Sequence, residues 1–216
     1  MTMKSRQRLI LLVNLGTPDA PNAGAVRRYL AEFLHDYRVV DLSRWLWCIL
    51  LHFIILPIRS GRVAGNYAKI WLPKGSPLLV YSRGLADKLQ HQMPNIEVRL
   101  AMRYGNPSIA SVLADYPDLQ ELTVLPLYPQ YSTTTTASVF DAVTRYYLKQ
   151  ERVPNLRFIR EYHRHPAWLD AMEARIRNHW DLLGRGERLL FSFHGIPQRF
   201  AERGEQDEDQ RASELT

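Results

Sequence analysis

One histidine stands where a side chain could transfer a proton or bind a metal ion. His194 directly follows the apolar run 188–193 and precedes Gly195-Ile196-Pro197, so we expect it on a tight turn at the end of a buried strand. The pKa of a free imidazole is about 6.5, which permits either role near neutral pH. A histidine that only packs within the fold remains an open interpretation, and the other six histidines form no zinc-binding pattern.

A second group of residues combines aromatic rings with hydroxyls. Tyr128 and Tyr131 are followed by Ser132 and the threonine run 133–136, at the start of a predicted helix. The hydroxyls could cap this helix. Alternatively, the N–H groups at its start could bind a carboxylate while the rings face a flat apolar molecule. The pair Arg103-Tyr104, after another predicted strand, could add a carboxylate-binding cation and one more ring.

Several other classes of site are missing from the sequence. It has no glycine-rich phosphate loop, no Gly-x-Ser-x-Gly motif and no recognisable nucleic-acid-binding module. Cys48 is the single cysteine, which excludes an internal disulfide and an all-cysteine metal cluster within one chain. The net charge of +6 includes an acidic tail at 201–216, so the remaining body is strongly basic. Such a body suits an anionic partner, whether nucleic acid, membrane surface or small molecule.

The elements that must position these residues alternate between strand and helix. Short apolar runs predict strands at 9–13, 98–102, 122–125, 156–159 and 188–193. Helical spacing predicts helices at 24–34, 108–116, 135–150 and 166–183, with Ser108 as an N-cap. This alternation predicts an α/β fold with a mostly parallel sheet flanked by helices. Ligands of such sheets bind beyond the carboxyl ends of the strands, where the polar and aromatic groups lie.

The most hydrophobic stretch of the chain is residues 45–58. Its 14 residues are fewer than the roughly 20 that a membrane-spanning helix needs. Arg44 and Arg59 flank it, and tryptophans mark its start. Two interpretations stay open: a core helix, or a hydrophobic lip that rests in a membrane or accepts an apolar ligand. The N-terminal segment 1–7 is short and polar, and no signal-peptide pattern follows it, so we expect a cytoplasmic protein.

Five short phrases, taken together and in order, resemble the successive signatures of the ferrochelatase family. They extend the resemblance from about Leu9 to about Glu202, and the tail at 204–216 is expected to lie outside it. The phrases are Val13-Asn14-Leu15-Gly16-Thr17-Pro18, Gly75-Ser76-Pro77-Leu78, Met102-Arg103-Tyr104-Gly105, Leu127-Tyr128-Pro129-Gln130-Tyr131-Ser132 and Ser192-Phe193-His194-Gly195-Ile196-Pro197.

The resemblance implies a chelatase-like fold of two similar α/β domains. The first, residues 1–164, would be complete and the second, residues 165–216, incomplete, because family members normally continue for roughly a hundred more residues, about one domain. The missing part would supply a glutamate facing the histidine. Its absence would expose apolar surface and favour self-association.

The implied activity is that of a lyase of haem biosynthesis, which inserts Fe²⁺ into protoporphyrin IX to form protohaem. His194 matches the catalytic, metal-side histidine. The porphyrin-binding positions implied by the resemblance are Leu15, Tyr67, Ser76, Arg103, Tyr104, Tyr128, Ser132 and Thr134. Leu15 is apolar, which favours protoporphyrin over coproporphyrin.

The resemblance also implies partners and a location. Fe²⁺ is a substrate, and we expect neither a prosthetic group nor an iron–sulfur cluster, and no nucleic acid. Residues 45–58 fall where the family has a membrane-facing lip, which suggests a cytoplasmic protein peripheral to the inner membrane. Two alternatives remain: a non-catalytic fragment that binds porphyrin or haem, and a membrane-peripheral interaction protein without a tetrapyrrole.

Overall fold

The computed structural model describes residues 8–192, 194–195 and 198, and the chain divides into two compact units. Unit 1 contains the chain up to Tyr128 together with Thr133–Ile159. Unit 2 contains Pro129–Ser132 and the chain from Arg160 onward. The prediction of one complete and one incomplete domain, divided after residue 164, stays a prediction.

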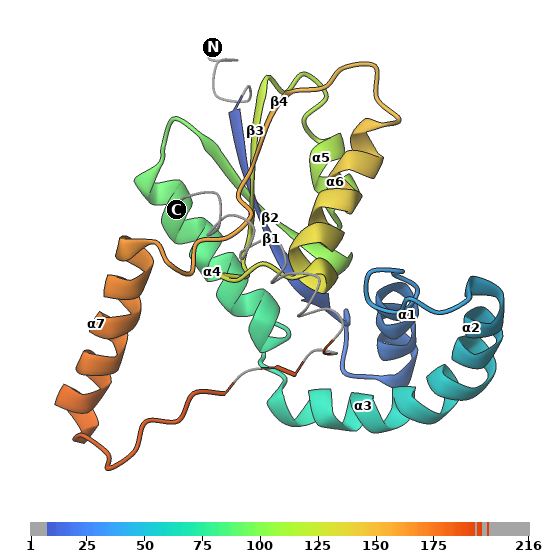
Figure 1. Cartoon of the computed structure of the whole chain (residues 1–216), viewed down its shortest axis with the longest axis horizontal. Helices are drawn as coiled ribbons and strands as arrows, with labels where there is room; N and C mark the ends of the chain where they lie inside the picture. Colours follow the sequence, from blue (N-terminus) through green and yellow to red (C-terminus); the bar gives the residue numbers. More distant parts are fainter. Residues whose placement is uncertain (1–7, 193, 196–197, 199–216) are drawn as a thin grey trace, which may run out of the picture. The chain divides into compact units, whose positions relative to one another are not determined.

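Unit 1 is built on a parallel four-stranded sheet in the order β2-β1-β3-β4 (Figure 1). The strands are β1 (Arg8–Thr17), β2 (Glu97–Gly105), β3 (Glu121–Pro126) and β4 (Asn155–Phe158). Leu9 pairs with Glu97 on one side and with Leu122 on the other, so β1 is a central strand. The predicted α/β class and the first four predicted strands are confirmed.

The helices also agree with most of the predictions. Ser108 caps α5 as predicted, because its Oγ accepts a hydrogen bond of 3.1 Å from the amide of Ser111. The helix predicted at 135–150 begins earlier, as the short π-helix η3, and ends at Tyr147. The helical elements are α1 (Ala23–Leu34), α2 (Arg44–Leu50), η2 (Leu51–Ile55), α3 (Leu56–Ile70), α4 (Pro77–Gln92), α5 (Ile109–Ala114), η3 (Thr133–Ala137), α6 (Ser138–Tyr147) and α7 (Pro166–Leu183).

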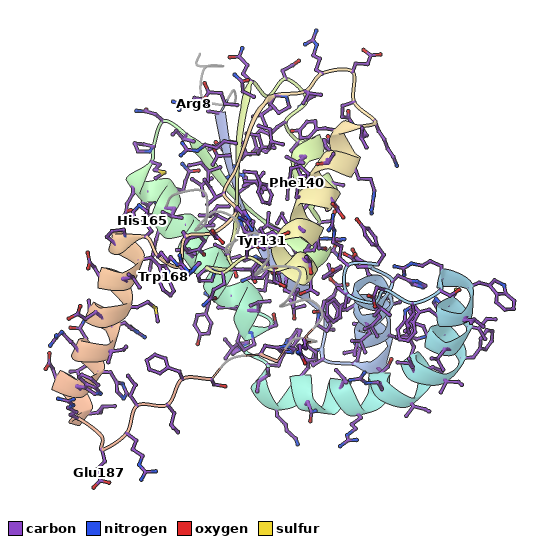
Figure 2. The ribbon with its side chains drawn as sticks, viewed as in Figure 1. Arg8, Tyr131, Phe140, His165, Trp168 and Glu187 are labelled. Atoms are coloured by element: carbon purple, nitrogen blue, oxygen red, sulfur yellow. The ribbon has the colours of Figure 1, made fainter. Side chains whose placement is uncertain are left out.

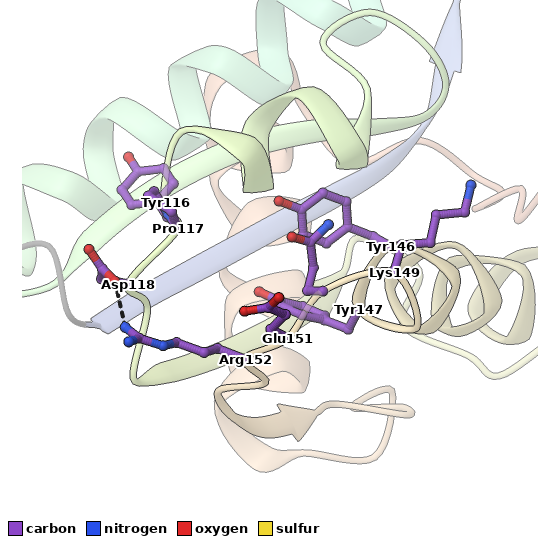
Figure 3. Close-up of a pocket in the computed structure, with 9 residues that line it drawn as sticks. Tyr116, Pro117, Asp118, Tyr146, Tyr147, Lys149, Glu151 and Arg152 are labelled. Atoms are coloured by element: carbon purple, nitrogen blue, oxygen red, sulfur yellow. Dashed lines mark hydrogen bonds and ion pairs between the residues drawn. The ribbon is translucent and has the colours of Figure 1, made fainter.

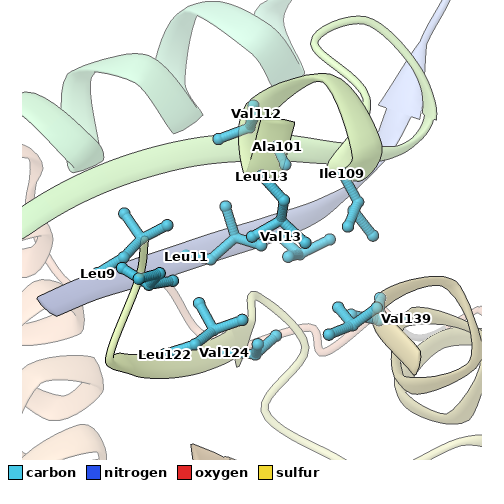
Figure 4. Close-up of a cluster of buried hydrophobic side chains, with 12 residues drawn as sticks. Leu9, Leu11, Val13, Ala101, Ile109, Val112, Leu113, Leu122, Val124 and Val139 are labelled. Carbon is cyan, nitrogen blue, oxygen red and sulfur yellow. The ribbon is translucent and has the colours of Figure 1, made fainter. Parts of the chain in front are cut away.

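Both faces of β1 are covered, which explains its continuous apolar run. Leu9, Leu11 and Val13 point to one face, where α5 and α6 complete a core with side chains such as Val139 (Figure 4). Leu12 points to the opposite face and packs with Met102 and with residues of α4. Successive side chains of a strand alternate between faces, so a strand buried on both sides must be apolar throughout.

The strand predicted at 188–193 is wrong for the residues that the structure describes. Residues 188–192 form no strand, and Leu189, Leu190 and Phe191 are 47%, 88% and 67% exposed. A strand needs a hydrogen-bonded neighbour, and the described part of unit 2 contains no strand. One contact within this unit places the guanidinium carbon of Arg160 4.3 Å from the ring centre of Tyr131, which is labelled in Figure 2. Phe193 lies outside the described residues.

The apolar segment at 45–58 belongs to a longer helix. α2, η2 and α3 run on without a break from Arg44 to Ile70, and this 27-residue helix is long and apolar enough to cross a membrane by length and composition. Leu51 and Leu56 are buried, and α3 packs against α1. By contrast, Trp45, Phe53 and Ile58 are 73%, 78% and 71% exposed. The helix therefore presents a broad apolar face to its surroundings, and the core-helix interpretation is wrong.

Candidate functional site

The carboxyl ends of β1 and β2 approach each other through two glycines. Gly16 pairs with Tyr104 and has φ +116°, and a Cβ at Gly16 would lie 1.8 Å from the carbonyl oxygen of Tyr104. Gly105 has φ +79°, and a Cβ there would lie 2.8 Å from the carbonyl oxygen of Thr17. Positive φ and backbone contact at this range both require glycine. The phrases that contain Gly16 and Gly105 thus have a geometric reason for glycine at these positions.

Four tyrosines gather near this edge of the sheet. Tyr104 is fully buried, with its ring edge-on to Phe33 at 5.1 Å, and Tyr29 and Tyr67 share a side-chain hydrogen bond. Burial, above all, raises the pKa of Tyr29, Tyr104 and Tyr128, with a smaller contribution from neighbouring tyrosines for Tyr29 and Tyr128. These phenols are therefore neutral at physiological pH. Tyr67, Tyr104 and Tyr128 were predicted site residues, whereas Tyr29 was missed.

The hydroxyl of Tyr128 is buried and has no hydrogen-bond partner among the residues that the structure describes. An unpaired buried hydroxyl costs free energy, and most buried polar groups in native proteins are paired with protein atoms or ordered water. Tyr128 follows β3, and the amide of Leu127 donates a 2.8 Å hydrogen bond to the carbonyl of Val13. Tyr128 therefore lies just beyond the carboxyl end of β3, the strand next to β1 in the sheet.

Asp36 is a buried acceptor that the sequence interpretation missed. Its Oδ2 accepts hydrogen bonds from Arg103 Nη2 at 2.5 Å, Ser138 Oγ at 2.5 Å and Tyr104 Oη at 2.8 Å. Arg103 also donates from Nε to the carbonyl and Oγ of Ser138, at 2.9 and 2.6 Å. Burial by itself raises the pKa of the Asp36 carboxyl, but hydrogen bonds, first that of Ser138, and the charge of Arg103 outweigh it and lower this pKa.

This network changes the role expected for Arg103. Its side chain is only 11% exposed, and its guanidinium is paired with Asp36 rather than left for a ligand carboxylate. The guanidinium carbon also lies 4.4 Å from the centre of the Tyr104 ring. Arg103 and Asp36 together hold Tyr104 in place, so their contribution to the tyrosine cluster is to position this ring.

Three further predicted site residues, Ser76, Leu15 and Thr134, also lie in unit 1. Ser76 is 2% exposed and caps α4, because its Oγ accepts a 3.2 Å hydrogen bond from the amide of Leu79. Leu15 is half-buried near the end of β1. Thr134 is half-buried in η3, and π-helical turns occur often at functional sites. The N-cap position of α6 is Ala137, because η3 leads directly into α6.

Ser132 and His194 belong to unit 2. His194 is exposed, and a Cβ on the adjacent Gly195 would meet nothing within 4 Å. Ile196 and Pro197 of the predicted turn lie outside the described residues. The structure therefore brings Tyr67, Arg103, Tyr104 and Tyr128 into one unit and assigns the predicted catalytic histidine to the other.

A cavity of about 490 Å³ lies at the opposite edge of the sheet (Figure 3). Its lining comes from the segments that precede β3 and β4, and it includes the exposed ion pair of Arg152 with Asp118, at 3.0 Å. It contains none of the predicted site residues. Ligands of parallel sheets bind at the carboxyl edge, so we assign no function to this cavity.

The fold and the site together define an α/β protein with a cluster of neutral tyrosines at the carboxyl edge of a parallel sheet. The ferrochelatase family model matches residues 8–214 of this chain. The chain is 50% identical over 203 residues to a ferrochelatase of Vibrio atlanticus, covering 93% of this chain and 63% of the relative. It is 50% identical over 206 residues to that of Vibrio cholerae, covering 94% and 64%. The chain therefore belongs to the ferrochelatase family.

The matches also correct the predicted extent of the resemblance. A ferrochelatase of Yersinia enterocolitica is 49% identical over 216 residues, covering 99% of this chain and 67% of the relative. The family match reaches residue 214, so the prediction that the acidic tail at 204–216 lies outside the family was wrong. The chain spans less than two thirds of the length of the Vibrio relatives.

Proposed function

We propose that this protein acts as a ferrochelatase, inserting Fe²⁺ into protoporphyrin IX to form protohaem. The observation that carries the proposal is the cluster of buried, neutral tyrosines at the carboxyl edge of the sheet, in a chain about half identical to curated ferrochelatases. Neutral aromatic rings suit a flat macrocycle, because they contact its faces without placing a charge against them.

The porphyrin would contact unit 1 through the partly exposed rings of Tyr67 and Tyr128 and through Leu15, with the buried rings of Tyr29 and Tyr104 behind them. The buried hydroxyl of Tyr128, unpaired among the described residues, would gain a partner when the ligand binds. The hydroxyls of Ser76, Ser132 and Thr134 are proposed to line the pocket or hold the propionates. Since Arg103 is already paired with Asp36, it contributes by holding Tyr104 rather than by binding a propionate directly.

His194 is proposed to take the proton or bind the metal. Insertion of Fe²⁺ requires both pyrrole N–H groups to lose their protons, one of them to His194 when it acts as the base and the other to water. The resulting dianion binds Fe²⁺ through its four nitrogens, so that Fe²⁺ and porphyrin give haem and two protons. A neutral imidazole can accept such a proton or ligate Fe²⁺ as it arrives. Its exposed position leaves the ring accessible to either substrate. The iron is a substrate here, and we propose that the reaction needs no prosthetic group and no iron–sulfur cluster.

The apolar helix supports a location at a membrane surface. Its exposed face carries Trp45, Leu46, Phe53 and Ile58, and arginines flank the segment. Aromatic and aliphatic side chains on one face, bordered by arginines, favour the interface of an anionic bilayer. We therefore propose a cytoplasmic protein that docks peripherally through residues 45–58, near its hydrophobic substrate. The uncovered apolar surface of unit 2, such as Leu190, would favour self-association.

The proposal is tested with the purified chain, protoporphyrin and Fe²⁺ under anaerobic conditions. Haem absorbance should appear as porphyrin fluorescence falls, and His194→Ala should abolish turnover while porphyrin binding persists. His179→Ala, an exposed histidine of α7, is the matched control and should keep full activity. Porphyrin binding without turnover in the unaltered chain would favour a non-catalytic porphyrin-binding protein. Absence of porphyrin binding would overturn the proposal.

A further inference from the structure

Three metal-ligand side chains meet where the end of α1 packs against the apolar helix. His35 follows α1, Cys48 lies in α2, and His52 lies in η2. The two Nε2 atoms of His35 and His52 are 2.9 Å apart. One ligand atom from each of the three residues lies within 4.8 Å of the other two. None of these residues belongs to the tyrosine cluster or to the predicted porphyrin-binding positions.

The local structure holds this group together without a metal. Arg44 Nη1 donates a 2.7 Å hydrogen bond to the carbonyl of His35, and Trp47 Nε1 donates one of 2.7 Å to the carbonyl of Leu34. These two bonds join the last turn of α1 to α2. Cys48 and His52 are four residues apart on one continuous helix, so their side chains share a face. The ligand set is thus largely preorganised.

The position of His35 is fixed from the other side as well. The next residue, Asp36, is held by Arg103, Tyr104 and Ser138 in the buried network described above. Leu51, fully buried, anchors the π-helical turn that carries His52. Both histidines are therefore attached to rigid parts of unit 1.

The donor set of two imidazoles and one thiolate has a clear chemical preference. It suits borderline-soft divalent ions such as Zn²⁺, and hard ions such as Mg²⁺ and Ca²⁺ require oxygen ligands instead. Around one tetrahedral zinc ion, bonds of about 2.0–2.3 Å place neighbouring ligand atoms roughly 3.3–3.6 Å apart. In the structure the two nitrogens are closer than this, at 2.9 Å, and all three ligand atoms lie within 4.8 Å of one another. Three protein ligands leave a fourth position for water.

The charge and exposure around the ring of His35 decide whether a cation can reach it. A histidine binds a metal ion through its neutral imidazole. Arg44 is the charged group that faces this ring, and a bound thiolate would offset its repulsion of a cation. Cys48 is exposed, so an ion from solution can reach the thiol.

We propose that His35, Cys48 and His52 form a binding site for one transition-metal ion of the zinc type, with three protein ligands and one open position. Such an ion would join the end of α1 directly to the apolar helix. The site shares no residue with the proposed chelatase chemistry, and it is independent of that function.

Cobalt is the probe, because Co²⁺ replaces Zn²⁺ in tetrahedral sites and reports its ligands by absorbance. The full chain, kept reduced, should bind one Co²⁺ with intense visible bands and a thiolate-to-cobalt charge-transfer band, and added Zn²⁺ should remove both. Cys48→Ser should lose the charge-transfer band. His35→Ala and His52→Ala should each weaken Co²⁺ binding by at least about tenfold. His91→Ala, an exposed histidine of α4, should change nothing.

A second measurement does not depend on the spectrum. Zn²⁺ should raise the thermal midpoint of the unaltered chain and leave that of Cys48→Ser unchanged, since a ligand that binds the folded state stabilises it. Circular dichroism without metal confirms that the variants are folded. A chain with no charge-transfer band, or Cys48→Ser with unchanged Co²⁺ affinity, would overturn the site. Neither result bears on haem formation, which the His194 assay tests separately.

Discussion

Replacing Asp36 by alanine should destabilise unit 1 strongly, although Asp36 touches no proposed substrate atom. Its Oδ2 accepts three side-chain hydrogen bonds, one of them from a guanidinium that is only 11% exposed. In Asp36→Ala, the charge of Arg103 stays buried without a counter-ion. Removing one partner of a buried ion pair costs about 3–5 kcal/mol, because the other charge is left uncompensated.

The remaining bonds place the expected cost near the lower end of that range. Arg103 Nε keeps its bonds to the carbonyl and Oγ of Ser138, and the hydroxyls of Tyr104 and Ser138 lie 3.1 Å apart, so they can still pair. We therefore expect a loss of about 3 kcal/mol in the free energy of unfolding. A typical domain has only about 5–15 kcal/mol in total, so the folded state would survive with a reduced margin.

Equilibrium unfolding in urea, followed by circular dichroism, measures this loss. The matched control is Asp118→Ala, which breaks the pair with Arg152, whose side chains are 81% and 83% exposed. An exposed pair is worth at most about 1 kcal/mol, so this variant should unfold almost like the unaltered chain. If Asp36→Ala also loses less than about 1 kcal/mol, the Asp36 network does not hold the site, and our account of Arg103 is refuted.

Three further predictions follow from the same contacts. The pKa of the Asp36 carboxyl is lower in the folded than in the unfolded protein, so its ionised form stabilises the fold. This stabilisation is present above the unfolded pKa of about 4 and is lost as the pH falls through the folded pKa. Asp36→Asn should therefore flatten the fall in stability below about pH 4, which acid titrations monitored by circular dichroism measure. Gly16→Ala should lower the free energy of unfolding by more than about 3 kcal/mol, or prevent folding, because its Cβ would meet the carbonyl oxygen of Tyr104 at 1.8 Å and φ is +116°. Phe53→Glu should weaken binding to anionic vesicles by roughly tenfold or more in flotation assays, because burying a phenylalanine side chain contributes about 1.5–3 kcal/mol.

Two of these predictions have a matched control variant, and Asp36→Asn is compared with the unaltered chain. Gly84→Ala in α4 should be tolerated, because a Cβ there meets nothing within 4 Å. Leu182→Glu, on an equally exposed residue of α7, should leave vesicle binding unchanged. The predictions fail if Asp36→Asn keeps the acid sensitivity of the unaltered chain, if Gly16→Ala is as stable as Gly84→Ala, or if Phe53→Glu and Leu182→Glu bind vesicles equally well.

The strands of unit 1 could be predicted from sequence because each is a local apolar run. β1 is buried on both faces, so its signal is continuous and strong. The run at 188–192 is also apolar, yet it forms no strand. A strand also needs a hydrogen-bonded neighbour that is distant in sequence, and the composition of a short run does not indicate whether such a neighbour exists. The apolar helix was underestimated in length because its second half, beyond Arg59, is mixed in polarity and is held by packing against α1.

The candidate site was predictable in part. Tyr67, Tyr104 and Tyr128 were found through short phrases that resemble a known family. Asp36 was missed because an acidic residue just after a helix looks like an ordinary surface charge. Its burial arises only when the chain brings Arg103, 67 positions later, against it. Tyr29 was missed for a related reason, since its spacing in α1 indicates only a packed helical residue.

The strand order has a consequence for how the chain folds during synthesis. Leu9 of β1 pairs with Glu97 and Leu122, so the first strand made has no partner until most of unit 1 has been translated. At about 5–20 residues per second, the 88 residues from Ile10 through Glu97 take roughly 4–18 s to add. Throughout that interval the apolar residues 9–13 lack both of their strand partners, and transiently exposed apolar surface of this kind is prone to aggregation.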